Sequence, residues 1–240
     1  MIIWLASYPR SGNTYFRLLL NHLYGIKTRS VYDDPLLARL EGSSELVGHE
    51  LLNGSLEDLD HSKEFFFVKT HHLPSDNRPA IQIVRDGRDA LVSYSQFTLS
   101  FENPYQSMGR WSRFVRNVAG WSEQEAILRQ LIVSTGGDFG GWSENVVAWG
   151  SRRAKTVTVR YEDLVGNPID EVTRSLAELQ ISGDQLRESI SLPSFDELNK
   201  RWPQFFRQGK TGGWRSSMTP KLADLFWDHH RAGMELYGYQ

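Results

Sequence analysis

The sequence predicts an α/β fold with a central parallel sheet covered by helices on both faces. Short apolar runs bounded by turn residues alternate with segments of helical periodicity, and this alternation is typical of parallel sheets joined by crossover helices. Strands that are covered on both faces are apolar throughout, so the runs are expected to be buried strands. They are residues 2–6, 65–68, 80–84 and 156–159.

The segments between these runs are expected to be helices. Two later helices are marked by their first residues: Ser194 with Glu197 can form a capping box, and Thr219 precedes Pro220 at a first helical position. The chain has 240 residues and no repeat or linker, which predicts a single domain over 1–240. The expected helices before residue 160 are 13–24, 89–97, 123–134 and 143–153.

The composition excludes several kinds of site. There are no cysteines, so disulfides, thiolate nucleophiles and cysteine-bound zinc are excluded, and the pair His229 and His230 lacks a third metal ligand. A formal net charge of −2 gives no overall basic field of the kind that nucleic-acid-binding proteins carry. No apolar run approaches the roughly 20 residues that span a bilayer. We therefore expect a cytoplasmic protein without a metal, a nucleic-acid partner or a membrane span.

Two stretches, 27–62 and 98–141, fit the predicted alternation poorly. Loops this long in a compact domain are usually functional or disordered. The second is rich in aromatic residues, which favours a partly ordered substrate lid, although plain helical packing explains it equally well.

The first predicted strand runs directly into a short polar segment that opens a helix. Such a junction presents backbone N–H groups and the positive helix end to an anion. Gly12 allows close approach, Ser11, Asn13 and Thr14 add donors or a cap, and Arg10 adds a cation. The segment lacks the glycine spacing and the lysine of a Walker A loop. By itself it could also be an ordinary helix cap with a surface arginine.

A second candidate site lies where the third predicted strand ends. Arg85 ends this strand and Ser93 follows eight residues later, within the next helix. Ligands of open α/β sheets bind at the carboxyl ends of strands, so Arg85 could meet a second anionic group. The alternative is a surface loop in which Arg85, Asp86, Arg88 and Asp89 form ion pairs with one another.

Six segments together resemble the cytosolic and bacterial sulfotransferase family, in the family's order and over nearly the whole chain. This resemblance implies a P-loop-NTPase-like fold and a donor, 3′-phosphoadenosine 5′-phosphosulfate (PAPS), whose product is 3′-phosphoadenosine 5′-phosphate (PAP). The segments are residues 8–14, 69–71, 85 with 93, 161–164, 194–195, and 207–209 with 211–214.

The resemblance also implies roles for individual residues. His71 would be the general base, while Arg10 and Lys69 would stabilise charge on the phosphate and sulfuryl oxygens. The segment that holds Trp142, Asn145 and Trp149 lies near the acceptor pocket in relatives, although core packing explains both tryptophans as well. The implied donor-binding residues are Arg10, Ser11, Gly12, Asn13, Thr14, Tyr15, Arg85, Ser93, Tyr161, Ser194, Phe195, Arg207, Gln208 and Gly209. Within this set, Arg85, Ser93 and Arg207 would bind the 3′-phosphate, and Tyr15, Phe195 and Tyr161 would hold adenine.

The chain departs from the family pattern at several positions. Arg10 and Gln208 stand where many members have lysine, and Tyr15 replaces a tryptophan. One residue is inserted after His71, which makes His72 a rival for the base. If the strand continues past residue 67, Lys69 and His71 point to one face and His72 to the other, which favours His71. The dimerisation segment is only faintly similar, so a homodimer is unsupported.

Two other functions remain as alternatives. A small-molecule kinase that uses ATP and magnesium would share the fold, but the Walker lysine is missing and only Asp86 and Asp89 could substitute for a metal-holding carboxylate. A non-catalytic nucleotide-binding protein would need neither Lys69 nor His71. The expected acceptor is a small molecule or glycoconjugate that offers a hydroxyl or an amine, and the sequence does not separate these classes.

Overall fold

The computed structural model describes most of the chain, as two compact units. Unit 1 comprises Met1–Ser7, Ser11–Arg85 and Ala148–Gly209, and unit 2 comprises Tyr8–Arg10, Asp86–Val147 and Lys210–Gln240. The residues described are 1–32, 37, 41–52, 54–62, 64–101, 120–181, 192–203, 205–206, 209 and 211–240.

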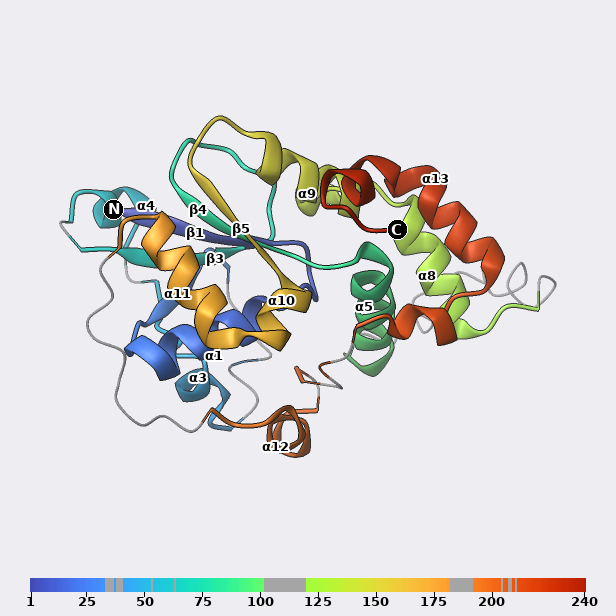
Figure 1. Ribbon diagram of the computed structural model, residues 1–240, viewed down its shortest axis with the longest axis horizontal. Coiled ribbons are helices and arrows are strands. Elements are labelled where there is room, and N and C mark those ends of the chain that lie inside the picture. Colours follow the sequence, from blue (N-terminus) through green and yellow to red (C-terminus); the bar gives the residue numbers. More distant parts are fainter. Residues whose placement is uncertain are drawn as a thin grey trace. The chain divides into compact units, whose positions relative to one another are not determined.

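Unit 1 is built on a five-stranded sheet in the order β2-β3-β1-β4-β5, with every neighbouring pair parallel. The prediction of an α/β fold around a parallel sheet is therefore confirmed (Figure 1). The strand β2 was not predicted, because its three residues contain no apolar side chain. The strands are β1 (Ile2–Ser7), β2 (Thr28–Ser30), β3 (Phe66–Thr70), β4 (Ala80–Val84) and β5 (Thr156–Arg160).

Helices cover both faces of this sheet. Helices α1, α10 and α11 lie on one side (Figure 1), and α4 packs with β1 on the other side. The sequence had predicted α1 with its observed bounds and the start of α12 at the Ser194 capping box, which is present. The helices of unit 1 are α1 (Asn13–Tyr24), α3 (Ser43–Leu46), α4 (Leu56–Asp60), α10 (Tyr161–Gly166), α11 (Pro168–Glu178) and α12 (Phe195–Arg201).

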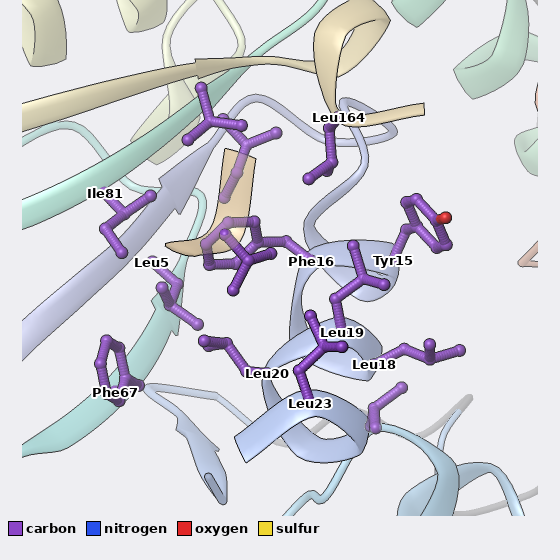
Figure 2. Packing of buried hydrophobic residues seen from close by; sticks show 14 of the residues in the cluster. Leu5, Tyr15, Phe16, Leu18, Leu19, Leu20, Leu23, Phe67, Ile81 and Leu164 are labelled. Carbon is purple, nitrogen blue, oxygen red and sulfur yellow. The ribbon is translucent and has the colours of Figure 1, made fainter. Parts of the chain in front are cut away.

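The two faces of β1 separate the core of unit 1 into two clusters. Ile3 and Leu5 face α1, and Figure 2 shows Leu5 directed toward Phe16 of that helix. Ile2, Trp4 and Ala6 face the opposite side. All of these side chains are buried. A central strand that is apolar on both faces is what the first run of the sequence predicted.

Unit 2 is helical. Helix α5 packs against α8, and α13 packs against both. Gly87 opens α5 where a Cβ atom would lie 2.5 Å from the Trp142 ring, so only glycine allows this approach. The helices are α5 (Gly87–Phe101), α8 (Glu123–Val133), η1 (Gly137–Phe139), η2 (Gly213–Ser216) and α13 (Pro220–Leu236), while α9 (Trp142–Ser151) contributes to both units.

Part of the stretch 98–141 that was expected to form a substrate lid, residues 102–119, lies outside the described residues. Of the remainder, α8 is an ordinary capped helix that begins after Ser122, with Ile127, Leu128 and Ile132 buried. Among the helices of the described ranges, none is both long enough and apolar enough to cross a membrane.

One prediction concerns the end of α11. Gln180 adopts φ 58, in the left-handed region, and the N–H of Ile181 donates to the carbonyl of Leu176, as in a Schellman cap. Glycine adopts this conformation without the steric cost that a Cβ atom brings. We expect Gln180→Gly to raise the free energy of unfolding by about 0.5–1 kcal/mol in urea titrations. Ala177→Gly, at an exposed position inside the same helix, should lower it by a similar amount. A loss of stability in Gln180→Gly would contradict this account.

A second prediction concerns His230 in α13. Its side chain is buried against Phe226 and Trp142, and burial, with a smaller contribution from His229, lowers its pKa to about 4. Folding therefore requires the neutral ring. The free energy of unfolding that depends on the neutral His230 ring is fully present above pH 6.5. It is lost as the pH falls toward 4, by about 1.4 kcal/mol per pH unit.

The measurement is urea denaturation between pH 7 and pH 4. The variant His230→Gln should lose less stability over this range than the wild-type protein does. The neighbouring His229 is exposed, so His229→Gln should keep the wild-type slope. Equal slopes for wild type and His230→Gln would show that this histidine does not control the acid sensitivity.

Candidate functional site

The first element of the site is the loop between β1 and α1. Gly12, at φ 104, precedes the helix, and within the described residues no side chain caps this end. The first N–H groups of α1 are therefore available to an anion. Ser11 is fully buried, and its Oγ has no hydrogen-bond partner in the described part of the chain. A buried hydroxyl that lacks a partner is a donor suited to a phosphate or sulfate oxygen.

Tyr161 connects this loop to Arg85. A Cβ atom on Gly12 would lie 2.4 Å from the Tyr161 ring, so the ring packs directly on the glycine backbone. The guanidinium carbon of Arg85 lies 4.4 Å from the centre of the same ring, at cation–π distance. These three residues follow β1, β5 and β4, whose carboxyl ends form one edge of the sheet. This is the edge where open α/β sheets bind ligands.

His71 is hydrogen-bonded to the end of β1. Its Nδ1 lies 2.7 Å from the backbone oxygen of Ser7. A carbonyl oxygen only accepts, so Nδ1 carries the proton and Nε2 carries the lone pair. This tautomer leaves Nε2 as the basic nitrogen.

Tyr32 brings the three basic residues of the 69–72 segment together. Its ring stacks on His71 with centroids 5.9 Å apart at 28° and lies 5.7 Å from the His72 ring. The Lys69 Nζ lies 5.3 Å from the centre of the same tyrosine ring. Both backbone groups of His72 are hydrogen-bonded: its N–H donates to Thr70 Oγ1, and its carbonyl accepts from the indole N–H of Trp149.

The aromatic residues expected at adenine form a second group in unit 1. The rings of Tyr15 and Phe195 lie 4.7 Å apart at 45°, and a Cβ atom on Gly209 would lie 2.6 Å from Phe195. Burial, with a smaller contribution from Tyr161, raises the pKa of Tyr15 to about 12. Ser194 is occupied in capping α12, where it exchanges hydrogen bonds with Glu197.

Unit 2 holds Arg10 and Ser93. The Nε of Arg10 donates to Ser93 Oγ at 3.2 Å, and its guanidinium lies over the Phe97 ring at 4.9 Å. Arg10 has φ 65, a strained conformation for a residue with a Cβ atom. The structure thus pairs Ser93 with Arg10, whereas the resemblance had grouped it with Arg85.

The acidic residues after β4 have structural partners. Asp86 forms an ion pair with Arg88 at 2.7 Å, one of the pairs that the alternative of a surface loop expected, but both residues are buried. Asp89 accepts hydrogen bonds from the backbone N–H groups of Gly212 and Trp214, at 2.6 and 2.8 Å. Asp89 therefore fixes the start of the C-terminal segment within unit 2, a role that sequence reasoning missed.

Several other expected residues are placed elsewhere or not described. Trp142 and Asn145 belong to the buried interior of unit 2, where Asn145 Nδ2 donates to the Phe139 carbonyl. Trp149 packs in the core of unit 1. Arg207 and Gln208 lie outside the described residues. Tyr32 was missed because it follows a strand without apolar residues, and no local pattern marks it.

Comparisons with known proteins point to one family. A family model described as a sulfotransferase domain matches residues 2–238. Cytosolic sulfotransferase 13 of Arabidopsis thaliana is 25% identical, and the match covers 92% of this chain and 73% of that protein.

Solved structures show the same fold. Mouse sulfotransferase SULT7A1 complexed with PAP superposes with a TM-score of 0.59 at 19% identity, over 100% of this chain and 89% of that one. Retinol dehydratase in complex with androsterone and the inactive cofactor PAP gives a TM-score of 0.58 at 17% identity, over 98% and 80%. With the family model matching nearly every residue, this chain belongs to the sulfotransferase family.

Proposed function

We propose that this protein transfers the sulfuryl group of PAPS to a hydroxyl or amine of a small-molecule or glycoconjugate acceptor. The observation that carries the proposal is the direct hydrogen bond from His71 to Ser7, the residue at which the loop of uncapped N–H groups begins. A general base is thereby held beside an anion-binding loop. Binding alone would need no such base.

The reaction follows from these residues as one in-line displacement. The acceptor oxygen attacks sulfur and passes its proton to His71 Nε2, while the bond between sulfur and the bridging phosphate oxygen breaks. PAP leaves with the negative charge that develops on that oxygen. The N–H groups at the start of α1 and the Arg10 guanidinium would stabilise this charge, and Lys69 would contact the sulfuryl oxygens.

Nucleotide recognition would use the second group of residues. Arg85, resting on Tyr161, would meet the 3′-phosphate together with Arg207, and we retain Ser93 as a third contact. Tyr15 and Phe195 would enclose adenine, since their rings and the Gly209 backbone already lie together. The complex of SULT7A1 with PAP supports this nucleotide as the product of the donor.

Calorimetric titration with PAP, AMP and ATP–magnesium tests the donor. We expect magnesium-independent binding of PAP that exceeds the binding of AMP by at least about tenfold, because the 3′-phosphate adds about −1.5 to −2 charge next to Arg85. Arg85→Ala should weaken the binding of PAP far more than the binding of AMP. Arg153→Ala, which removes an exposed arginine of the same unit, should change neither. Stronger binding of ATP–magnesium than of PAP would favour a kinase instead. Equal losses of affinity for PAP and AMP in Arg85→Ala would refute the contact between Arg85 and the 3′-phosphate.

Turnover measurements test the base. We expect His71→Ala to lower kcat by about a hundredfold or more, because general-base catalysis contributes at least that much. The affinity for PAP should remain nearly unchanged. His72→Ala is the matched control and should keep most of the activity. The reverse result, with His72 essential and His71 dispensable, would transfer the role to His72.

A further inference from the structure

A chain of hydrogen bonds joins the start of α1 to His71. The side-chain amide of Asn13 donates from Nδ2 to the carbonyl of Leu5 at 2.9 Å and to Ser7 Oγ at 3.2 Å. Ser7 in turn accepts from His71 Nδ1 through its backbone oxygen at 2.7 Å, and its Oγ lies 3.3 Å from the same nitrogen. Asn13 and Ser7 are 4% and 1% exposed, so the bonds of the Asn13 amide are shielded from water, while His71 is half-buried.

The orientation of the Asn13 amide is determined by its partners. The Leu5 carbonyl only accepts, so the NH₂ group must face it. The Oδ1 of Asn13 then has no hydrogen-bond partner among the described residues, although it is buried. An unsatisfied buried oxygen destabilises the fold. The amide thus donates to the two acceptors at the end of β1, while its own oxygen is left without a partner among the described residues.

This arrangement has two consequences for the loop. Asn13 is the first residue of α1 and its amide turns back to β1, while Gly12, which has no side chain, takes the capping position before the helix. The N–H groups at the start of α1 therefore stay available to the donor. The same amide ties the end of β1 to the beginning of α1, so the stem of the loop is closed by a side chain.

We propose that Ser7 and Asn13 are positioning residues that hold His71 in the Nδ1–H tautomer while they close the stem of the donor loop. This inference rests on the proposed role of His71 as the base. When Nε2 takes the acceptor proton, the bond from Nδ1–H to the Ser7 carbonyl remains and becomes charge-assisted, which stabilises the imidazolium. Geometry at the donor loop and at the base thereby depends on the same two residues, Ser7 and Asn13.

Ser7→Ala is the central test. It removes the hydroxyl that accepts from the Asn13 amide and lies 3.3 Å from His71 Nδ1, and it leaves the backbone acceptor in place. We expect kcat to fall about tenfold, because small displacements of a catalytic group have effects of this size or larger, with PAP affinity changed less than about twofold. Ser7→Thr restores a hydroxyl and should recover most of the loss. Asn13→Ala should lower kcat and also weaken PAP binding, because it opens the loop stem.

Nitrogen-15 NMR of the histidine-labelled protein gives a readout that a purely structural role would not change. The wild-type His71 signal, assigned by its loss in His71→Gln, should show a single Nδ1–H tautomer, and Ser7→Ala should show a mixture. Ser175→Ala is the matched control, since Ser175 is also buried and its hydroxyl donates to the Val172 carbonyl in α11. It should leave both kcat and the spectrum unchanged.

The outcomes separate this inference from the proposed function. An Nε2–H tautomer in the wild type, or a Ser7→Ala variant with wild-type kcat and one tautomer, would overturn the positioning role alone. Full turnover in His71→Ala would remove the base and the positioning role together. If Ser7→Ala does not fold, as judged by thermal melting against Ser175→Ala, the wild-type spectrum decides: Nδ1–H upholds the inference and Nε2–H overturns it.

Discussion

The carboxyl end of β1 is the point on which the geometry of unit 1 depends. This strand is hydrogen-bonded to β3 on one side and β4 on the other and is buried on both faces, so its last residue has little freedom. Ser7 stands at that end, where it accepts from both Asn13 and His71. A strand that is paired on both sides and buried on both faces thereby positions the loop before α1 and the histidine at once.

The parts of the fold that could be predicted from the sequence are those specified by local patterns. Four strands coincide with predicted runs, although β5 alternates threonine with valine and is fully buried only at the valines. The residues that precede α12 and α13 carry capping side chains that the structure uses. The strand β2, with residues Thr-Arg-Ser, is held by pairing with β3 and has no such pattern. Helix α10 was not predicted, because it follows β5 without a break and no side chain caps its start.

The candidate site likewise contains residues that local patterns predict and residues that they do not. Gly12, Arg85 and His71 could be identified because they lie in short segments with a family pattern. The contacts of Tyr32 with His71 and Lys69 depend on the path of the chain after β2, and those of Asp89 with Gly212 and Trp214 join residues more than a hundred positions apart. Interactions of this kind arise from tertiary packing, so the local spacing of residues in the sequence does not predict them.

The contact between Gly12 and Tyr161 has an evolutionary consequence. Because the ring occupies the space that a Cβ atom at position 12 would need, the two positions cannot drift independently. A larger residue at 12 would require a smaller one at 161, and the guanidinium of Arg85 would then lose the surface on which it rests. Positions 12, 85 and 161, which follow three different strands, are therefore expected to covary among relatives.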